Sequence, residues 1–140
     1  MVLREIAVHR YSVYAVCRLP SEECQVERFL LAHRSSYPKA MRDLNSMLRD
    51  YTPQHGPPFE VEERAKRLRD GICEFRAREK RRERVPRILF FEDGMTVICT
   101  TAFLKSSSTP DFEIDQAIEI RKEYLRHKPG RLHILRGWGV

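Results

Sequence analysis

Three cations stand where short apolar segments of the chain begin or end. Arg76 closes the segment that follows Gly71, Arg87 opens the apolar run 87–91, and Lys105 ends the segment that follows Asp93-Gly94. Guanidinium and ammonium groups bind phosphate oxygens and stabilise the negative charge that develops on them. No nucleophile or catalytic acid lies nearby in a recognisable setting. The pattern therefore favours binding and polarising a phosphate, and RNA is the phosphate polymer that it indicates.

The segment between two of these cations is strongly basic. From Arg76 to Arg87 the chain carries seven basic residues against two glutamates, and the net charge of the whole chain is +6. Such a cluster is typical of a surface that binds nucleic acid or another polyanion. A solvated hairpin whose arginines protect a sheet edge would have the same composition. Charge alone leaves both interpretations open.

The bulk properties predict one globular domain. The 140 residues, of which 41% are apolar and 33% charged, fit a single domain spanning residues 1–140. The first residues show no secretory signal pattern, and no run approaches the roughly 20 apolar residues that a membrane span needs. We therefore expect a cytoplasmic protein with no membrane partner.

The cysteines and histidines show no ligand spacing. Cys17, Cys24, Cys73 and Cys99 form no Cys-x-x-Cys pair, and we interpret them as reduced thiols of the core. The five histidines are not spaced as metal ligands, either with one another or with the cysteines. We therefore expect no metal and no cofactor.

The first half of the chain predicts a strand region followed by two helices. Residues 4–17 are rich in β-branched and aromatic types, which favours one long strand or a bent pair. A helix is expected from Ser21, its N-cap, to His33, and a second from Pro38 to about Tyr51. The prolines of residues 52–58 predict an irregular loop.

The second half predicts a sheet closed by a helix. Strands are expected at residues 72–78, 87–91 and 95–104, with Asp93-Gly94 as a two-residue hairpin turn. A helix should follow, with Thr109 as its N-cap and Pro110 at its first position. Residues 128–140 either add a short edge strand or form an irregular tail.

The order of these motifs resembles the phage-derived, toxin-like branch of the RelE/HigB superfamily, the bacterial toxins of type II toxin–antitoxin modules. The resemblance spans residues 66–124, and the ordered series is more specific than any single motif. It rests on Lys66-Arg-Leu68-Arg-Asp70-Gly71-Ile-Cys-Glu74-Phe-Arg76, Pro86-Arg87-Ile-Leu-Phe-Phe91, Asp93-Gly94, Phe103-Leu-Lys105, Thr109-Pro110 and Arg121-Lys-Glu-Tyr124.

The resemblance implies an α+β, RelE-like (microbial-ribonuclease-like) fold, with a small antiparallel twisted sheet, an N-terminal helical hairpin and a C-terminal helix. It also implies a metal-independent endoribonuclease, or mRNA interferase, that cuts mRNA on the ribosome, inhibits translation and is neutralised by a cognate antitoxin protein. The family's catalytic cations fall on Arg76, Arg87 and Lys105. RNA supplies its own nucleophile, the 2′-OH, so these residues would stabilise the phosphorane. The cations expected to follow the RNA or ribosomal RNA backbone are Lys66, Arg67, Arg78, Lys80, Arg81, Arg82 and Arg84.

Departures from the family pattern support an alternative function. Ser106 stands where the family has a second lysine, and Pro86 stands where a tyrosine usually precedes the central arginine. The alternative is a catalytically degenerate phage or prophage protein that binds RNA or the ribosome. Each cation also has a structural alternative: Arg76 could line an exposed strand, Arg87 could pair with Glu74, and Lys105 could be merely solvated.

Overall fold

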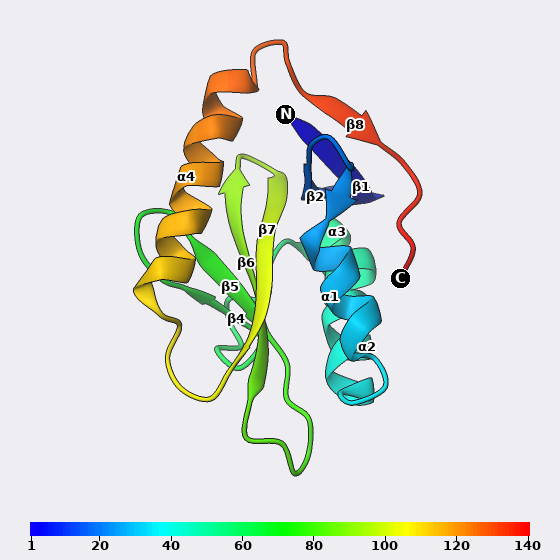
Figure 1. Cartoon of the computed structure of the whole chain (residues 1–140), viewed down its shortest axis with the longest axis vertical. Helices are drawn as coiled ribbons and strands as arrows, with labels where there is room; N and C mark the ends of the chain where they lie inside the picture. Colours follow the sequence, from blue (N-terminus) through cyan, green and yellow to red (C-terminus); the bar gives the residue numbers. More distant parts are fainter.

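A computed structural model describes the whole chain, residues 1–140, as one mixed sheet with helices on both faces (Figure 1). The sheet has eight strands in the order β4-β5-β6-β7-β2-β1-β8, and β3 pairs with β2. In chain order the elements are β1 (Val2–Val8), β2 (Ser12–Arg18), β3 (Glu23–Cys24), α1 (Gln25–His33), α2 (Pro38–Ser46), the π-helical turn η1 (Met47–Tyr51), α3 (Thr52–His55), β4 (Ala65–Arg67), β5 (Cys73–Arg76), β6 (Val85–Asp93), β7 (Thr96–Lys105), α4 (Asp111–His127) and β8 (His133–Leu135).

The predicted RelE-like arrangement is wrong in its sheet and in its N-terminus. The chain begins with strand β1, and the hairpin β1–β2 enters the sheet beside β7, with Ser12 opposite Thr96 in a parallel pair. The sheet is therefore larger than expected, and it is mostly rather than wholly antiparallel. The helical hairpin is therefore not N-terminal, as the RelE-like fold class had it, but follows β1 and β2 in the order that the residue patterns predicted. The alternation in residues 4–17 predicted strands, but the partner of β2 lies far along the chain and leaves no local pattern.

Helices α1 to α3 cover one face of the sheet. Their buried side chains include Leu30, Leu44 and Leu48, which pack with Phe75 and Phe90 in a cluster of 24 buried residues. A helix in each predicted place is confirmed, but α1 starts later than expected. Its N-cap is Cys24, whose sulfur accepts the backbone N–H of Glu27 at 3.5 Å.

Two details of the helical region differ from expectation. Ser21, the expected N-cap, lies in the turn before β3. The predicted loop 52–58 begins instead with the short helix α3, which continues from η1 and places Pro53 in its first turn. Pro53 has no N–H to donate to the preceding helical turn, whereas the Thr52 N–H before it still bonds to the carbonyl of Met47. None of the helices is both long and apolar enough to cross a membrane.

Strands β6 and β7 form the central hairpin in the predicted place, but its turn lies one residue later than expected. Asp93 is still part of β6 and pairs with Thr96, so Gly94 and Met95 form the two-residue turn, and Gly94 has φ +59°. A bulge between Ile88 and Phe90 interrupts the register, and such bulges increase the local twist. Along β6 the side chains alternate between the two faces, so both faces of the sheet have an apolar core.

Helix α4 covers the second face. Ile114, Ala117 and Tyr124 pack there in a separate cluster of eight buried residues. The first turn of α4 is tied to the β4–β5 turn by Arg69, which lies 3.4 Å from Asp111 and 2.8 Å from Asp115. The sheet face under the start of α4 is therefore held in a fixed relation to this helix.

The C-terminal segment adds the edge strand β8, one of the two outcomes that the sequence left open. Its residues pair in parallel with β1, with Val2 opposite His133. The last residues cross the helical layer, where the Trp138 indole N–H donates to Asn45 at 3.0 Å. Figure 1 shows this segment in red on the side of the molecule opposite α4.

Candidate phosphate-binding site

The sheet register brings the three predicted catalytic cations onto one face. Arg76 of β5 pairs with Arg87 of β6, and Arg87 pairs with Phe103 of β7. Lys105 follows Phe103 by two residues and therefore points to the same side. This face is the one that α4 covers, at the end of the sheet where α4 begins. The structure thus gathers three cations that are scattered along the sequence.

A buried carboxylate connects two of these cations. Glu74 is fully buried, and its Oε1 accepts the Arg76 Nε–H at 2.7 Å. Its Oε2 lies 3.9 Å from Nη1 of Arg87. Because one carboxylate faces two guanidinium groups, the cluster keeps a net positive charge. The salt bridge between Arg87 and Glu74, which the sequence left open as an alternative, is present in the structure.

Thr109 completes this cluster. Its hydroxyl donates to Glu74 and accepts the Arg87 Nη1–H at 2.8 Å. The predicted N-cap role of Thr109 is wrong, because Pro110 occupies the N-cap position and α4 has no side-chain cap. The hydroxyl accepts from Arg87 the kind of hydrogen bond that an N-cap would accept from a helix N–H group, and it donates to the buried carboxylate. The segment before α4 is thereby fixed to the sheet.

Arg87 and Arg76 differ in what they offer to a ligand. The Arg87 side chain is only 9% exposed and its Nε has no hydrogen-bond partner, whereas the Arg76 side chain is 20% exposed. Burial lowers the pKa of Arg87 from its ordinary value, and Glu74 opposes this shift. A guanidinium remains charged under such conditions. Arg76 can therefore reach a phosphate from this position, whereas Arg87 supports the cluster from below.

Lys105 lies at the rim of the cluster. Its side chain is partly exposed and its ammonium group makes no hydrogen bond or ion pair. Lys105 acts on the titration of Glu113 in α4. Burial raises the pKa of Glu113, and the positive charge of Lys105 opposes this rise. Lys105 is thus free to meet an anion, but no neighbouring group activates it as a base.

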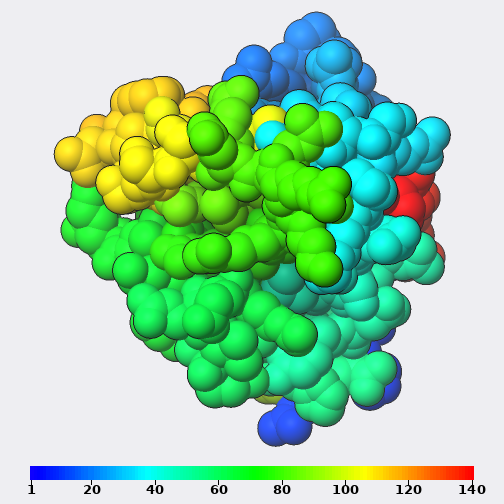
Figure 2. Space-filling view, turned by 90° about the horizontal axis from the view of Figure 1, so that it is seen from below, coloured from blue at the N-terminus to red at the C-terminus, as the bar shows by residue number.

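The predicted RNA-binding turn is an ordered basic loop, residues 78–84, between β5 and β6. Glu79 accepts the Ala40 N–H of α2 at 2.9 Å, the Arg82 guanidinium lies 5.3 Å from the centre of the Tyr37 ring, and Arg84 donates to a backbone carbonyl at 3.3 Å. Three cations of the loop remain exposed and without a protein partner. These are Arg78, Lys80 and Arg81. Figure 2 shows the loop in bright green as a ridge between the helical hairpin and the segment that leads to α4.

A groove runs beside this loop. It has a volume of about 420 Å³, and its basic lining residues are Lys39, Arg64, Arg76 and Arg78. Arg64 was missed in the sequence, because its position depends on the pairing of β4 with β5. Lys39 is held by Asp43 at 2.6 Å. Asp43 and Glu63 also line the groove, and Arg76 is the one residue of the Glu74 cluster that does.

The other two predicted RNA-binding residues lie apart from this surface. Lys66 of β4 pairs with Glu62 at 3.4 Å and lies opposite Glu74 in the sheet register. Arg67 points to the other face, where it lies 3.9 Å from the centre of the Phe59 ring and 3.2 Å from Glu92. Arg67 therefore supports packing.

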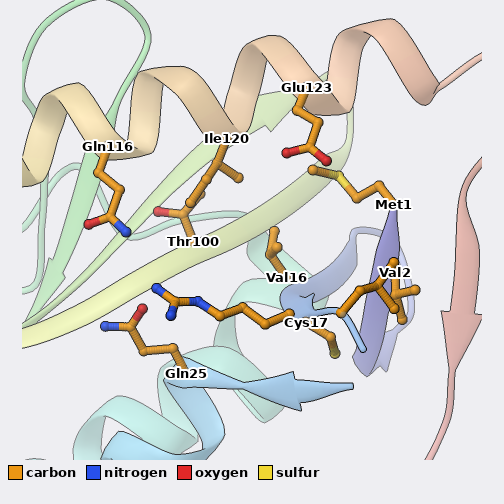
Figure 3. Close-up of a pocket in the computed structure, with 11 residues that line it drawn as sticks. Met1, Val2, Val16, Cys17, Gln25, Thr100, Gln116, Ile120 and Glu123 are labelled. Atoms are coloured by element: carbon orange, nitrogen blue, oxygen red, sulfur yellow. The ribbon is translucent and has the colours of Figure 1, made fainter. Parts of the chain in front are cut away.

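A separate cavity of about 280 Å³ lies between α4 and the strands β2 and β7 (Figure 3). Its polar lining includes Arg18, Gln25, Gln116 and Glu123. No residue of the basic loop lines this cavity, so it does not extend the basic surface. The basic loop, the groove and the rim of the Glu74 cluster therefore form the candidate site. Comparison with known proteins adds no family to this description: no protein-family model matches the sequence, and no curated protein sequence matches it.

Proposed function

We propose that this protein binds the phosphate backbone of RNA with the basic loop 78–84 and the adjoining groove. The single observation that supports the proposal most strongly is the unpaired state of Arg78, Lys80 and Arg81 on a loop that is itself fixed to α2 and β7. Cations held in place but not neutralised by the protein can release counterions from a nucleic acid. The expected partners are mRNA or ribosomal RNA in the cytoplasm.

The geometry favours binding over cleavage as the primary activity. In-line attack by a 2′-OH requires cations that touch the phosphate as charge develops on it. Arg87 is nearly buried, and its Nη1 donates to Thr109. Of the three predicted catalytic residues, only Arg76 and Lys105 are more than marginally exposed. Phosphate recognition needs no more than these exposed groups.

A salt-dependent binding assay tests the proposal. Fluorescence anisotropy of a labelled single-stranded RNA would be measured with the wild type and with the triple variant Arg78→Gln/Lys80→Gln/Arg81→Gln. Each lost phosphate contact reduces the slope of log K against log salt by about 0.7, so three contacts reduce it by about 2 and weaken binding about 100-fold at 0.1 M salt.

A matched triple variant controls for net charge. Arg10, Arg126 and Arg131 are also exposed and unpaired, and they lie in the β1–β2 turn, in α4 and before β8, none of which contacts the loop. Their replacement by glutamine removes the same charge and should leave the slope nearly unchanged. Equal losses in the two triple variants would show that RNA responds to net charge alone, and this result would refute the proposed surface.

A second candidate is ribosome-dependent cleavage of mRNA, as in a toxin that a cognate antitoxin neutralises. The observation that favours it is the placement of Arg76, Arg87 and Lys105 on one sheet face. Cell-free translation with primer extension tests it. Codon-positioned cuts that are lost in Lys105→Ala would support it, because Lys105 takes no part in packing; a folded wild type that makes no cuts would eliminate it. A small adjacent helix-turn-helix gene is expected only for this candidate.

A further inference from the structure

Two of the four cysteines face each other across neighbouring strands. Cys17 of β2 is the register partner of Cys24 of β3. Residues directly opposite in an antiparallel pair have Cα atoms about 4.5 or 5.5 Å apart, depending on the type of pair. Both separations lie within the range of about 4.4–6.8 Å that a disulfide spans. The backbone therefore holds these thiols at a distance suited to a disulfide without rearrangement.

The two thiols of this pair are electrostatically unequal. Interaction with the Cys24 thiol lowers the pKa of Cys17, burial opposes this shift, and the positive charge of Arg4 lowers the pKa further. Interaction with Cys17 and burial raise the pKa of Cys24, and Arg4 is not among the groups that lower it. Because Arg4 favours the thiolate of Cys17 and not that of Cys24, Cys17 is the thiol expected to ionise first, and a thiolate is the form that reacts with an oxidant.

The remaining two cysteines lack this arrangement. Burial raises the pKa of Cys73 to about 11, and complete burial raises the pKa of Cys99 as well. Neither has a second cysteine as its strand partner, since Cys73 lies opposite Phe90 and Cys99 opposite Ala15 and Phe90. They provide internal controls for the reactivity of a buried thiol in the same chain.

Arg4 and the C-terminal segment lie over the pair. Cys17 and Cys24 belong to the core cluster on the α1 side of the sheet, and in Figure 3 the Cys17 sulfur points away from α4. The Arg4 guanidinium donates to the backbone carbonyl of Gly137 at 3.2 Å and to that of Glu22 at 3.5 Å. Arg4 also donates to the backbone carbonyl of Arg136 at 3.5 Å and lies 4.0 Å from the Glu27 carboxylate. A small oxidant needs only a local displacement of this cover to reach Cys17.

We propose that Cys17 and Cys24 form a reversible disulfide when the protein meets a peroxide, with Cys17 as the thiol that is oxidised first. The Cys17 thiolate attacks one oxygen of hydrogen peroxide, the O–O bond breaks, and the S–O bond of a sulfenic acid forms as hydroxide leaves and takes up a proton. The Cys24 sulfur then attacks the Cys17 sulfur, the S–O bond breaks, and the Cys24 proton leaves with the oxygen as water. Two thiols lose two electrons, and one peroxide becomes two waters.

The disulfide would act on the start of α1. Cys24 is the N-cap of this helix, and Glu27 in its first turn accepts the Gly139 N–H at 2.8 Å. A covalent link from Cys24 to Cys17 would fix the turn 19–22 and the helix start to β2. The oxidised form should therefore hold the C-terminal segment more rigidly than the reduced form. This inference is independent of the proposed RNA-binding surface.

Peptide mapping of the full chain tests the proposal. The protein would be treated with hydrogen peroxide, alkylated with N-ethylmaleimide and digested with trypsin, which cuts at Arg18 between the two cysteines. Peptide 11–18 linked to peptide 19–28 is the expected product, and dithiothreitol should separate the two. The Cys17 thiol should be lost at least about tenfold faster than the Cys73 or Cys99 thiol.

Variants sharpen this test. The Cys73→Ala/Cys99→Ala chain should form the linked peptides as fast as the wild type, and Cys24→Ser should leave Cys17 as a sulfenic acid that dimedone traps. Wild-type protein that yields no linked peptides, or that loses Cys17 no faster than Cys99, would overturn the proposal. The wild-type measurement decides alone if a variant fails to fold, because Cys73 and Cys99 are its internal controls.

Discussion

Replacing Glu74 by glutamine should destabilise the protein more than any other single change of one polar group. Glu74 is fully buried and is the only carboxylate within ion-pair distance of Arg76 and Arg87. Glutamine has nearly the same shape, so the change removes the negative charge with little effect on packing. Two guanidinium groups, one of them nearly buried, would then face each other across the β5–β6 pair without a counter-charge.

The magnitude follows from the loss of one partner from a buried ion pair, which costs about 3–5 kcal/mol. The Arg76 side chain is 20% exposed and can turn partly to water, whereas the Arg87 side chain is 9% exposed and cannot. The lower part of the range, about 3 kcal/mol, is therefore expected. A domain of this size is stabilised by about 5–15 kcal/mol, so the variant should still fold at 25 °C. Its melting temperature should fall by roughly 10 °C.

Urea unfolding followed by circular dichroism measures this free energy, and a double-mutant cycle identifies its origin. Arg87→Met removes the cation that Glu74 neutralises while keeping an apolar stem of similar length. The double variant Glu74→Gln/Arg87→Met should be less destabilised than the sum of the two single variants, with a coupling of at least about 1 kcal/mol. A loss below about 1 kcal/mol for Glu74→Gln, or strictly additive changes, would refute the view that Arg87 depends on the Glu74 charge.

Three further predictions concern other contacts of the framework. Tyr124→Phe should cost about 1.5 kcal/mol in urea unfolding, because the Tyr124 hydroxyl donates to Asp93 at 2.8 Å; an unchanged stability would contradict this role. Hydrogen bonds from Lys128 and Tyr124 lower the pKa of Asp93 below its ordinary value of 3.8. The ionised Asp93 therefore stabilises the folded state above pH 3.8, and this stability is lost as the pH falls through the lower pKa of the folded state. In Asp93→Asn, the free energy of unfolding measured against pH should fall less steeply in this acidic range. Glu79→Ala should cost about 1 kcal/mol, since Ala40 N–H loses its acceptor, and limited trypsin digestion should cut the basic loop faster than in the wild type.

Local patterns predicted the central hairpin and most helices, but not the topology of the sheet. The alternation of residues 72–78 and the turn signal at Asp93-Gly94 act between neighbours in sequence, and the structure has a strand and a hairpin turn at these places, with a shorter strand (Cys73–Arg76) and a turn one residue later (Gly94-Met95). The parallel pairing of Ser12 with Thr96 joins strands that are far apart in sequence. No residue type or spacing in residues 4–17 specifies that partner, because a strand with apolar side chains on both faces fits several central positions.

The candidate site was partly predictable for a similar reason. The cations were visible as a charge pattern, and their shared face followed once the register was known. The contacts of Thr109 with Glu74 and Arg87 were missed, because a threonine directly before Pro110 is the usual sequence pattern of an N-cap. The buried carboxylate of Glu74 takes the hydroxyl instead, and only the packing of α4 on the sheet brings the two together. Contacts between elements, rather than spacing within them, decide this site.

The network around Glu74 also bears on the choice between binding and cleavage. Arg87 could touch a phosphate only if the hydrogen bond from its Nη1 to the Thr109 hydroxyl were broken. The same hydroxyl is also held by its hydrogen bond to Glu74. Exposing Arg87 therefore requires movement of the segment before α4, which Arg69 anchors through Asp111 and Asp115. Phosphate binding by the basic loop requires no such movement. A ribosome or RNA that supported cleavage would have to supply the free energy for this displacement, so cleavage by the isolated protein should be undetectable even where binding is strong.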